Sequence, residues 1–178
     1  EYTIQVALLK DIVTLTIDTS GSSLHKRGYR ANALDAPLKE TLAAAMIELS
    51  YWNKDRVLMD PFCGSGTIPI EAAMIARNIA PGLNRHFASE KWDRVPEKLW
   101  KEERKKAYAA IDYDCMPEIY GSDIDPAAIE LAKSNAELAG VDDCITFEVK
   151  PVQELELYGD YGCLITNPPY GERLGDMK

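Results

Sequence analysis

Hydrophobic and polar residues alternate in two stretches near the start of the chain, at residues 2–8 and 12–18. Strict alternation over this length is typical of a strand that buries one face. The polar pair Lys10-Asp11 lies between the two stretches. They are therefore predicted to pair as a β-hairpin.

Beyond residue 20 the pattern changes to helices that alternate with short apolar strands. Helices are predicted at residues 37–50, 68–77, 101–111 and 126–139, strands at residues 57–59, 119–120, 144–149 and 163–166, and a long loop at residues 83–100. Strands that alternate with helices indicate an α/β fold, with a parallel sheet and right-handed crossovers.

Two of the helices carry informative detail. Asp125 is an expected cap, Pro126 fits a first helical position, and Gly140 fits a helix end, so the helix at 126–139 is sharply bounded. In the helix at 37–50, Pro37 is tolerated in the first turn. The face expected to be buried there holds Leu38, Leu42, Ala45, Met46 and Leu49.

Composition narrows the class of protein. Hydrophobic residues make up 46% of the 178 positions, yet no apolar run of 18 residues occurs, so no membrane partner is predicted. The four cysteines match no zinc pattern and no C-x-x-C redox pair, so we predict no metal site and free thiols in a reducing compartment. The chain starts at Glu1 without a leader, which favours a piece of a longer cytoplasmic protein over a secreted one.

The net charge of −9 argues against a nucleic-acid partner as an average, but the charges are unevenly distributed. Residues 107–164 hold most of the excess acid, which leaves two locally basic stretches at 24–39 and 85–106. Such stretches are candidate contacts for RNA. For residues 98–106, a solvated helix face is the simpler interpretation.

Three polar segments follow three of the predicted strands: Asp60–Thr67, Asp123 and Asn167–Tyr170. In an open parallel sheet, ligands bind at the carboxyl ends of the strands. The three segments are therefore expected to form one site.

The first segment, DPFCGSGT, contains Gly64 and Gly66, which allow a sharp turn and a close approach to a ligand. No G-K-[ST] follows, so a phosphate cradle is disfavoured. Asp60 at the strand tip suits an ammonium group. An ordinary strand-to-helix turn is the alternative.

The second segment, GSDID, places Asp123 where an acid commonly holds a ribose diol, whereas Asp125 is better explained as the helix cap. Ile124 would flank an adenine ring. Together the two segments describe S-adenosylmethionine better than a dinucleotide. The predicted cofactor-binding residues are Asp60, Phe62, Cys63, Gly64, Ser65, Gly66, Thr67, Asp123, Ile124 and Asn167.

The third segment, NPPY, has a chemistry of its own. The Asn167 carboxamide offers an acceptor, and Pro168 and Pro169 stiffen the backbone and leave its carbonyls free. These acceptors can hold an exocyclic amino group for attack on a methyl donor, while Tyr170 offers a stacking face for the base. We predict that Asn167, Pro168, Pro169 and Tyr170 are catalytic; the alternative is a proline-rich turn.

The NPPY motif resembles that of class I amino-methyltransferases, which act on adenine N6, guanine N2 or a glutamine amide. A closer resemblance rests on five stretches: GSSLHKRGYR (21–30), APLKETLAAAM (36–46), DPFCGSGTIPIEAAMIARNIAPG (60–82), GSDIDPAAIELAKSNAELAG (121–140) and NPPYGERLG (167–175). These look like the bacterial large-subunit ribosomal RNA guanine-N2 methyltransferases that carry a THUMP domain.

The resemblance implies a Rossmann-like class I methyltransferase fold of seven strands, of which this chain holds the first, cofactor-binding half. Residues 1–20 would be a β-hairpin linker from a THUMP domain, and residues 21–178 a C-terminally truncated methyltransferase domain. It also implies that Arg30 helps to close the cofactor or RNA site. One departure is Pro151, which stands about where many methyltransferases place an Asp near the adenine, so backbone groups near Val152 are expected to replace it.

The sequence therefore predicts an S-adenosylmethionine-dependent RNA methyltransferase that modifies guanine N2 of ribosomal RNA. Methylation of adenine N6 in DNA or RNA, or of a protein glutamine, is the alternative within enzymes. A non-catalytic RNA-binding fragment is the alternative from another class.

Overall fold

The computed structural model describes residues 2–30, 38–156, 158 and 160–169. At its N-terminal end, β1 (Thr3–Leu9) and β2 (Ile12–Asp18) pair antiparallel, with Val6 opposite Leu15. Lys10 and Asp11 form the turn with φ of 51° and 61°, as a two-residue hairpin turn requires. The predicted hairpin is confirmed, and its role as a linker to a preceding domain stays a prediction.

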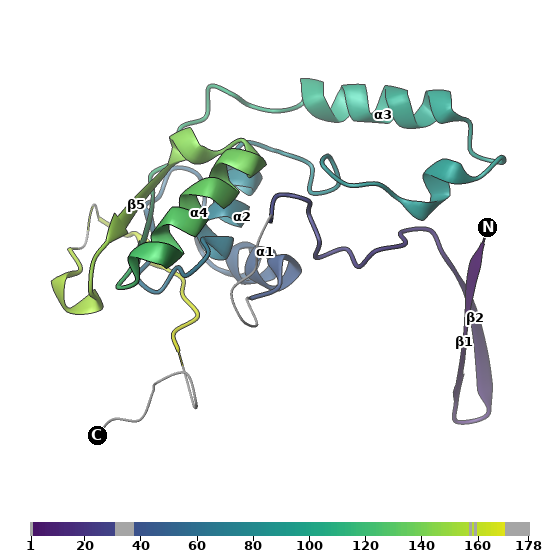
Figure 1. The fold of residues 1–178 in the computed structure, drawn as a ribbon, viewed down its shortest axis with the longest axis horizontal. Helices are drawn as coiled ribbons and strands as arrows, with labels where there is room; N and C mark the ends of the chain where they lie inside the picture. The colour runs from purple at the N-terminus through teal and green to yellow at the C-terminus, as the bar shows by residue number, and fades with distance from the viewer. Residues whose placement is uncertain (1, 31–37, 157, 159, 170–178) are drawn as a thin grey trace.

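The second sheet has four parallel strands: β3 (Leu58–Asp60), β4 (Ile119–Asp123), β5 (Ile145–Val149) and β6 (Cys163–Leu164). Their order is β5-β4-β3-β6. The predicted α/β fold with a parallel sheet and a preceding hairpin is confirmed (Figure 1).

Four α-helices accompany the strands: α1 (Glu40–Leu49), α2 (Thr67–Ala76), α3 (Glu97–Ala109) and α4 (Pro126–Ala139). Helices α2 and α4 pack against β3, β4 and β5 and against each other, and α1 packs on α2. Three short 3-10 turns lie at Ala88–Lys91, Asp142–Cys144 and Val152–Glu154. The apolar core lies between the sheet and α1, α2 and α4.

The predicted boundaries of α4 are confirmed. The Asp125 carboxylate accepts a hydrogen bond from the Ala127 N–H at 2.9 Å, Pro126 is the first helical residue, and Gly140 ends the helix with φ of 73°. The predicted loop at 83–100 is only partly right, because it contains the turn at Ala88–Lys91 and the first residues of α3.

The predicted buried face of α1 is only partly right, because Leu38 and Met46 pack against the core whereas Leu42 is exposed. Ala43 and Ile47 are buried, whereas Leu49 is 88% exposed. Glu40 shares the buried face because its carboxylate lies 3.6 Å from the Arg30 guanidinium. An ion pair with the segment that precedes α1 thus helps to orient the helix. The predicted first turn at Pro37 lies outside the described residues.

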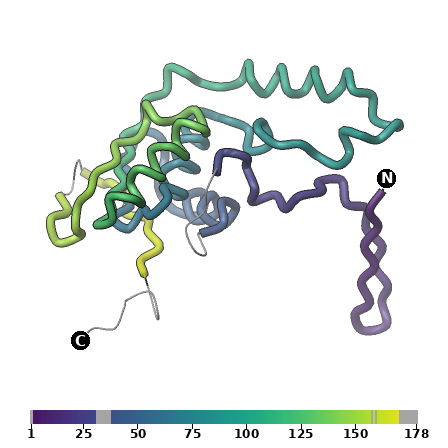
Figure 2. Tube along the Cα trace, viewed as in Figure 1, coloured from purple at the N-terminus to yellow at the C-terminus, as the bar shows by residue number. Residues whose placement is uncertain are grey.

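A long excursion separates α2 from β4. It leaves the end of α2, turns near the hairpin and returns along α3, which buries none of its residues (Figure 2). The hairpin lies at the opposite end of the molecule from the parallel sheet (Figure 1). Among the described residues, no helix is long and apolar enough to cross a membrane. The four cysteines are free, with Cys63 and Cys144 buried.

Candidate active site

The three predicted segments meet at one edge of the parallel sheet. The order β4-β3-β6 places the end of β3, at Asp60, between the ends of the other two strands. Past β6, the Ile165 N–H donates to the Met59 carbonyl at 3.0 Å, so the parallel pairing continues toward Asn167. Asp60, Asp123 and Asn167 therefore follow three adjacent strands, as the sequence predicted.

Gly64 and Gly66 serve different purposes in the turn between β3 and α2. Both have left-handed backbones, with φ of 52° and 81°. A Cβ on Gly64 would meet nothing within 4 Å, so its backbone is open to a ligand. A Cβ on Gly66 would lie 3.0 Å from the Ala132 Cβ and 3.1 Å from the Phe147 ring. Gly66 is therefore required for packing against α4 and β5, whereas we predicted a close approach to a ligand.

Asp123 is built into the same turn. One carboxylate oxygen accepts from the Gly64 N–H at 3.0 Å, and the other accepts from the Asp125 N–H at 3.0 Å. Each oxygen keeps a second lone pair for another donor. Ile124, next to it, is exposed. The Asp123 side chain thus fixes the turn and can still accept hydrogen bonds from a ligand.

Most other residues of the turn point into the protein. Cys63, Ser65 and Thr67 are buried, whereas Phe62 is partly exposed. The Cys63 N–H donates to the Ser122 carbonyl at 3.0 Å. The buried side chains support the turn from the protein interior, and Gly64 and Asp123 form its more accessible side.

Asn135 on α4 supports the turn, and sequence reasoning missed it. Its side chain is 0% exposed and donates to the Ser65 carbonyl at 3.0 Å. The signal in the sequence was a polar residue between Ala132 and Ala136, on the face of α4 that is otherwise apolar. A buried amide at such a position requires a partner.

Residues 27–30, which precede α1, form polar contacts with α2. Arg30 donates to the Thr67 hydroxyl at 2.7 Å. Arg27 and Tyr29 both contact the buried Glu71 carboxylate, at 3.2 and 3.1 Å. Burial dominates the raised pKa of the Glu71 carboxyl.

These contacts revise the basic stretch at 24–39. Arg27 and Arg30 are paired inside the protein with Glu71 and Glu40, so they are not surface contacts for RNA. Arg30 contacts Thr67, the first residue of α2, and its role in closing the cofactor or RNA site stays a prediction.

The basic stretch at 85–106 is also largely paired. Arg85 is buried and donates to the backbone carbonyls of Ser20, Ser22, Ser23 and Lys26. Arg104 is paired with Glu90 at 2.6 Å. Lys98, Lys101 and Lys106 pair with acids one turn away on α3. A solvated helix face therefore describes Lys98, Lys101 and Lys106, whereas Arg85 and Arg104 connect parts of the chain.

Asp60 is the most unusual acid of the site. Its side chain is 2% exposed. Its Oδ1 atom accepts from the Thr166 hydroxyl at 2.7 Å and from the Phe62 N–H at 3.2 Å. Burial raises the pKa of Asp60 to about 7, and the nearby Asp123 raises it further, while the two hydrogen bonds lower it. Such a shift in a buried acid at a strand tip is typical of a functional group.

The third segment is described as far as Pro169. Asn167 is partly buried, and Pro168 and Pro169 are exposed. The Asn167 side chain makes no hydrogen bond to another described residue. Tyr170 lies outside the described residues.

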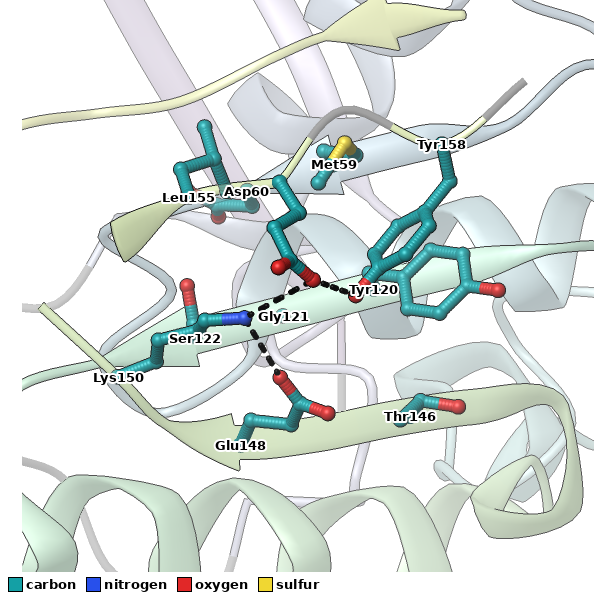
Figure 3. A pocket seen from close by; sticks show the side chains of 11 residues that line it. Met59, Asp60, Tyr120, Gly121, Ser122, Thr146, Glu148, Lys150, Leu155 and Tyr158 are labelled. Carbon is teal, nitrogen blue, oxygen red and sulfur yellow. Dashed lines mark hydrogen bonds and ion pairs between the residues drawn. The ribbon is translucent and has the colours of Figure 1, made fainter. Parts of the chain in front are cut away.

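A shallow pocket opens on the sheet face that carries the Met59, Tyr120 and Glu148 side chains (Figure 3). Asp60 lines it together with Tyr120, Thr146, Glu148 and side chains beyond β5. Lys150 forms ion pairs with Glu148 at 3.7 Å and with Glu156 at 3.8 Å. Gly64, Asp123 and Asn167 do not line this pocket, so Asp60 lies between it and the other strand ends.

Comparison with known proteins is consistent with this geometry. Residues 27–178 match the family described as the RMKL-like methyltransferase domain. The chain is 49% identical, over its full length, to the Bacillus subtilis protein named "Putative RNA methyltransferase YpsC". It is 52% identical over 93% of its length to "Ribosomal RNA large subunit methyltransferase K/L" of Shewanella sediminis.

A solved structure is similarly close. SMU.472, described as "a putative methyltransferase complexed with SAH", superimposes with a TM-score of 0.90 and 47% identity over 99% of this chain and 46% of its own. The chain spans 46% of the B. subtilis relative and 24% of the S. sediminis relative. The match covers the sheet, the turn at Asp60–Thr67 and the segment at Asn167, and on this basis the chain belongs to the family of RMKL-like methyltransferase domains.

Proposed function

We propose that the protein is an S-adenosylmethionine-dependent RNA methyltransferase that modifies the exocyclic N2 amino group of a guanine in ribosomal RNA. The observation that carries the proposal is the meeting of Asp60, Asp123 and Asn167 at the ends of three adjacent parallel strands. Family membership and the names of the relatives support it. A ribosomal RNA substrate would place the protein in the cytoplasm.

The residues at β3 and β4 fit S-adenosylmethionine. Asp60 would pair with the ammonium group, since its Oδ2 atom has no hydrogen-bond partner among the described residues. The free lone pairs of Asp123 would accept from the ribose hydroxyls, and the bare Cα of Gly64 would let the ligand lie against the backbone. When bound, S-adenosylmethionine supplies an activated methyl group.

The segment after β6 would hold the target amine. The Asn167 side-chain carbonyl and the Pro168 backbone carbonyl are the expected acceptors for its two N–H bonds. They orient the nitrogen lone pair and stabilise the positive charge that grows on nitrogen during methyl transfer. Tyr170 would supply the stacking face for the base.

The internal pairing of the arginines favours the enzyme over a non-catalytic RNA-binding fragment. Arg27, Arg30, Arg85 and Arg104 all hold the fold together. A module whose only purpose was to bind RNA would be expected to present such groups to solvent. Methylation of adenine N6 remains the alternative within enzymes, because the same acceptors suit any exocyclic amine.

Mass spectrometry of ribosomal RNA nucleosides tests the proposal. A strain that lacks the whole protein should lose N2-methylguanosine at a specific position of the large-subunit RNA. Loss of N6-methyladenosine instead would support the alternative base. Unchanged methylation of both, with DNA unchanged as well, would contradict the assignment of a nucleic-acid methyltransferase.

Substituting the neighbouring acids Asp123 and Asp125 one at a time should have different effects, one on cofactor binding and the other on stability. Asp123→Ala should weaken S-adenosylmethionine binding by roughly 1.5–3 kcal/mol, because a charge-assisted acceptor for the ribose is removed. Asp125→Ala should leave binding nearly unchanged and lower the free energy of unfolding by about 1 kcal/mol, because it removes the cap of α4. Calorimetric titration and urea unfolding measure the two effects. The reverse pattern would show that the roles of the two acids are exchanged.

RNA affinity is expected to depend on the exposed charges near α3. Reversing the charges of Arg94, Lys98 and Lys101 in the whole protein should weaken RNA binding and make it depend less on salt. The slope of log affinity against log salt concentration should flatten by roughly 0.7–0.9 for each phosphate that is no longer neutralised. Lys133→Glu on α4, which also breaks an exposed ion pair, is the matched control. An unchanged salt slope in the triple variant would mean that this surface is only solvated.

A further inference from the structure

We propose that Thr166 is a positioning residue that connects the cofactor-binding and catalytic segments by holding the Asp60 carboxylate through its hydroxyl. The inference rests on the proposed function, since it concerns the same site. Thr166 is the residue immediately before Asn167, and its partner lies 106 residues away in the sequence. Neither the motif nor the sequence pattern assigned it a role.

The parallel pairing of β3 with β6 brings the two residues together. Met59 lies opposite Leu164, and the Ile165 N–H donates to the Met59 carbonyl at 3.0 Å. One residue further along each strand, the Thr166 hydroxyl donates to the Asp60 Oδ1 atom at 2.7 Å. This distance is typical of a charge-assisted O–H···O⁻ bond.

The hydroxyl matters more than the shape of the side chain. At a strand end beside the buried Ile165, valine would satisfy the backbone preference equally well, because both residues are β-branched. Only threonine can donate to the carboxylate. The bond fixes the Asp60 rotamer, which leaves the Oδ2 atom for the cofactor ammonium, and it anchors the backbone from which Asn167 projects.

Other groups around Asp60 do not replace this bond. Asp123 lies at the end of β4, and its negative charge disfavours a charged Asp60. Cys63 lies in the turn as a neutral thiol, because burial raises its pKa. On the pocket side, Lys150 is the only cation among the lining residues that the structure describes, and it is paired with Glu148 and Glu156. The other titratable groups among the described lining residues are Tyr120 and Tyr158. Their ring centroids lie 4.8 Å apart.

The experiment compares Thr166→Val with Thr166→Ser in the whole protein. Calorimetry would measure the affinity for S-adenosylhomocysteine, which carries the amino-acid ammonium, at pH 6.0 and pH 8.5. The second ligand is 5′-methylthioadenosine, which has the same nucleoside but no ammonium group. Thermal unfolding at both pH values would check that each variant folds.

The valine variant loses a hydrogen bond to the ionised carboxylate, so the pKa of Asp60 should rise further. Its affinity for S-adenosylhomocysteine should therefore fall about tenfold at pH 6.0 and at most about threefold at pH 8.5. Its affinity for 5′-methylthioadenosine should not change at either pH. The serine variant should behave like the parent.

Each other outcome has a definite meaning. An equal loss of affinity for both ligands at both pH values would overturn the inference, because Thr166 would then only support the fold. An unchanged affinity for S-adenosylhomocysteine in the valine variant would overturn it as well. If the parent protein itself does not bind S-adenosylhomocysteine, the proposed function fails, and the inference fails with it.

Discussion

Asn167→Ala in the whole protein should lower the rate of methyl transfer at least about 10²-fold to 10³-fold, by analogy with the loss of one preorganised hydrogen-bonding group at an oxyanion. The affinity for S-adenosylhomocysteine should change by less than about threefold, since Asp60 and Asp123 are the main cofactor contacts that we propose. The Asn167 side chain has no partner among the described residues, which leaves it free for the target amine. Its bonds strengthen as that nitrogen becomes positive, and only such differential interactions change the chemical step.

Single-turnover kinetics with saturating RNA would measure this effect. Asn167→Asp is the matched variant, because it keeps an acceptor in the same place and should retain partial activity. An alanine variant that methylates at the parent rate would mean that the NPPY segment is only a stiff turn.

Asp60→Asn should make the protein more stable and less able to bind its cofactor. A carboxyl group with a pKa of about 7 in the folded protein and about 3.9 when unfolded binds its proton more tightly in the folded state. Its contribution to stability is fully present below about pH 4 and is lost as the pH rises through about 7. At pH 8 the folded protein therefore holds a buried carboxylate at a cost of roughly 2–4 kcal/mol.

The asparagine variant removes that cost, so its free energy of unfolding should exceed that of the parent at pH 8 and depend less on pH between 5 and 8. Urea unfolding at several pH values would measure the difference. The exposed Asp55→Asn is the control and should change neither stability nor binding. Binding of S-adenosylmethionine to Asp60→Asn should fall at least about tenfold, because the proposed partner of the ammonium group loses its charge. A variant that is less stable at pH 8 and binds normally would show that Asp60 is a structural acid.

The parts of the fold that depend on neighbouring residues were predictable from the sequence. Asp125, Pro126 and Gly140 define α4 within a few residues of one another, and the Lys10-Asp11 turn defines the hairpin. The three strand ends could be placed together because parallel strands end at the same edge of a sheet.

The errors concern contacts between distant residues. Glu40 faces the core of the protein because of Arg30, which no helical periodicity reveals. The basic stretches were interpreted without their partners, such as Glu71, which lies 44 residues from Arg27. Asn135 and Thr166 were missed for the same reason, since their partners lie 70 and 106 residues away.

The residues of the site were easier to identify than their individual roles. Gly64 and Gly66 look alike in the sequence, yet one Cα faces open space and the other faces Ala132 and Phe147. A sequence motif shows that glycine is needed, and only the packing shows whether the neighbour is a ligand or the protein itself.

The most direct test of the proposed cofactor site is a calorimetric titration of the whole protein with S-adenosylhomocysteine at pH 8.5, beside its Asp123→Ala variant. We expect one site with a micromolar dissociation constant, and at least about tenfold weaker binding to the variant. No binding to the parent protein, or equal binding to both, would contradict the claim that these strand ends hold the methyl donor.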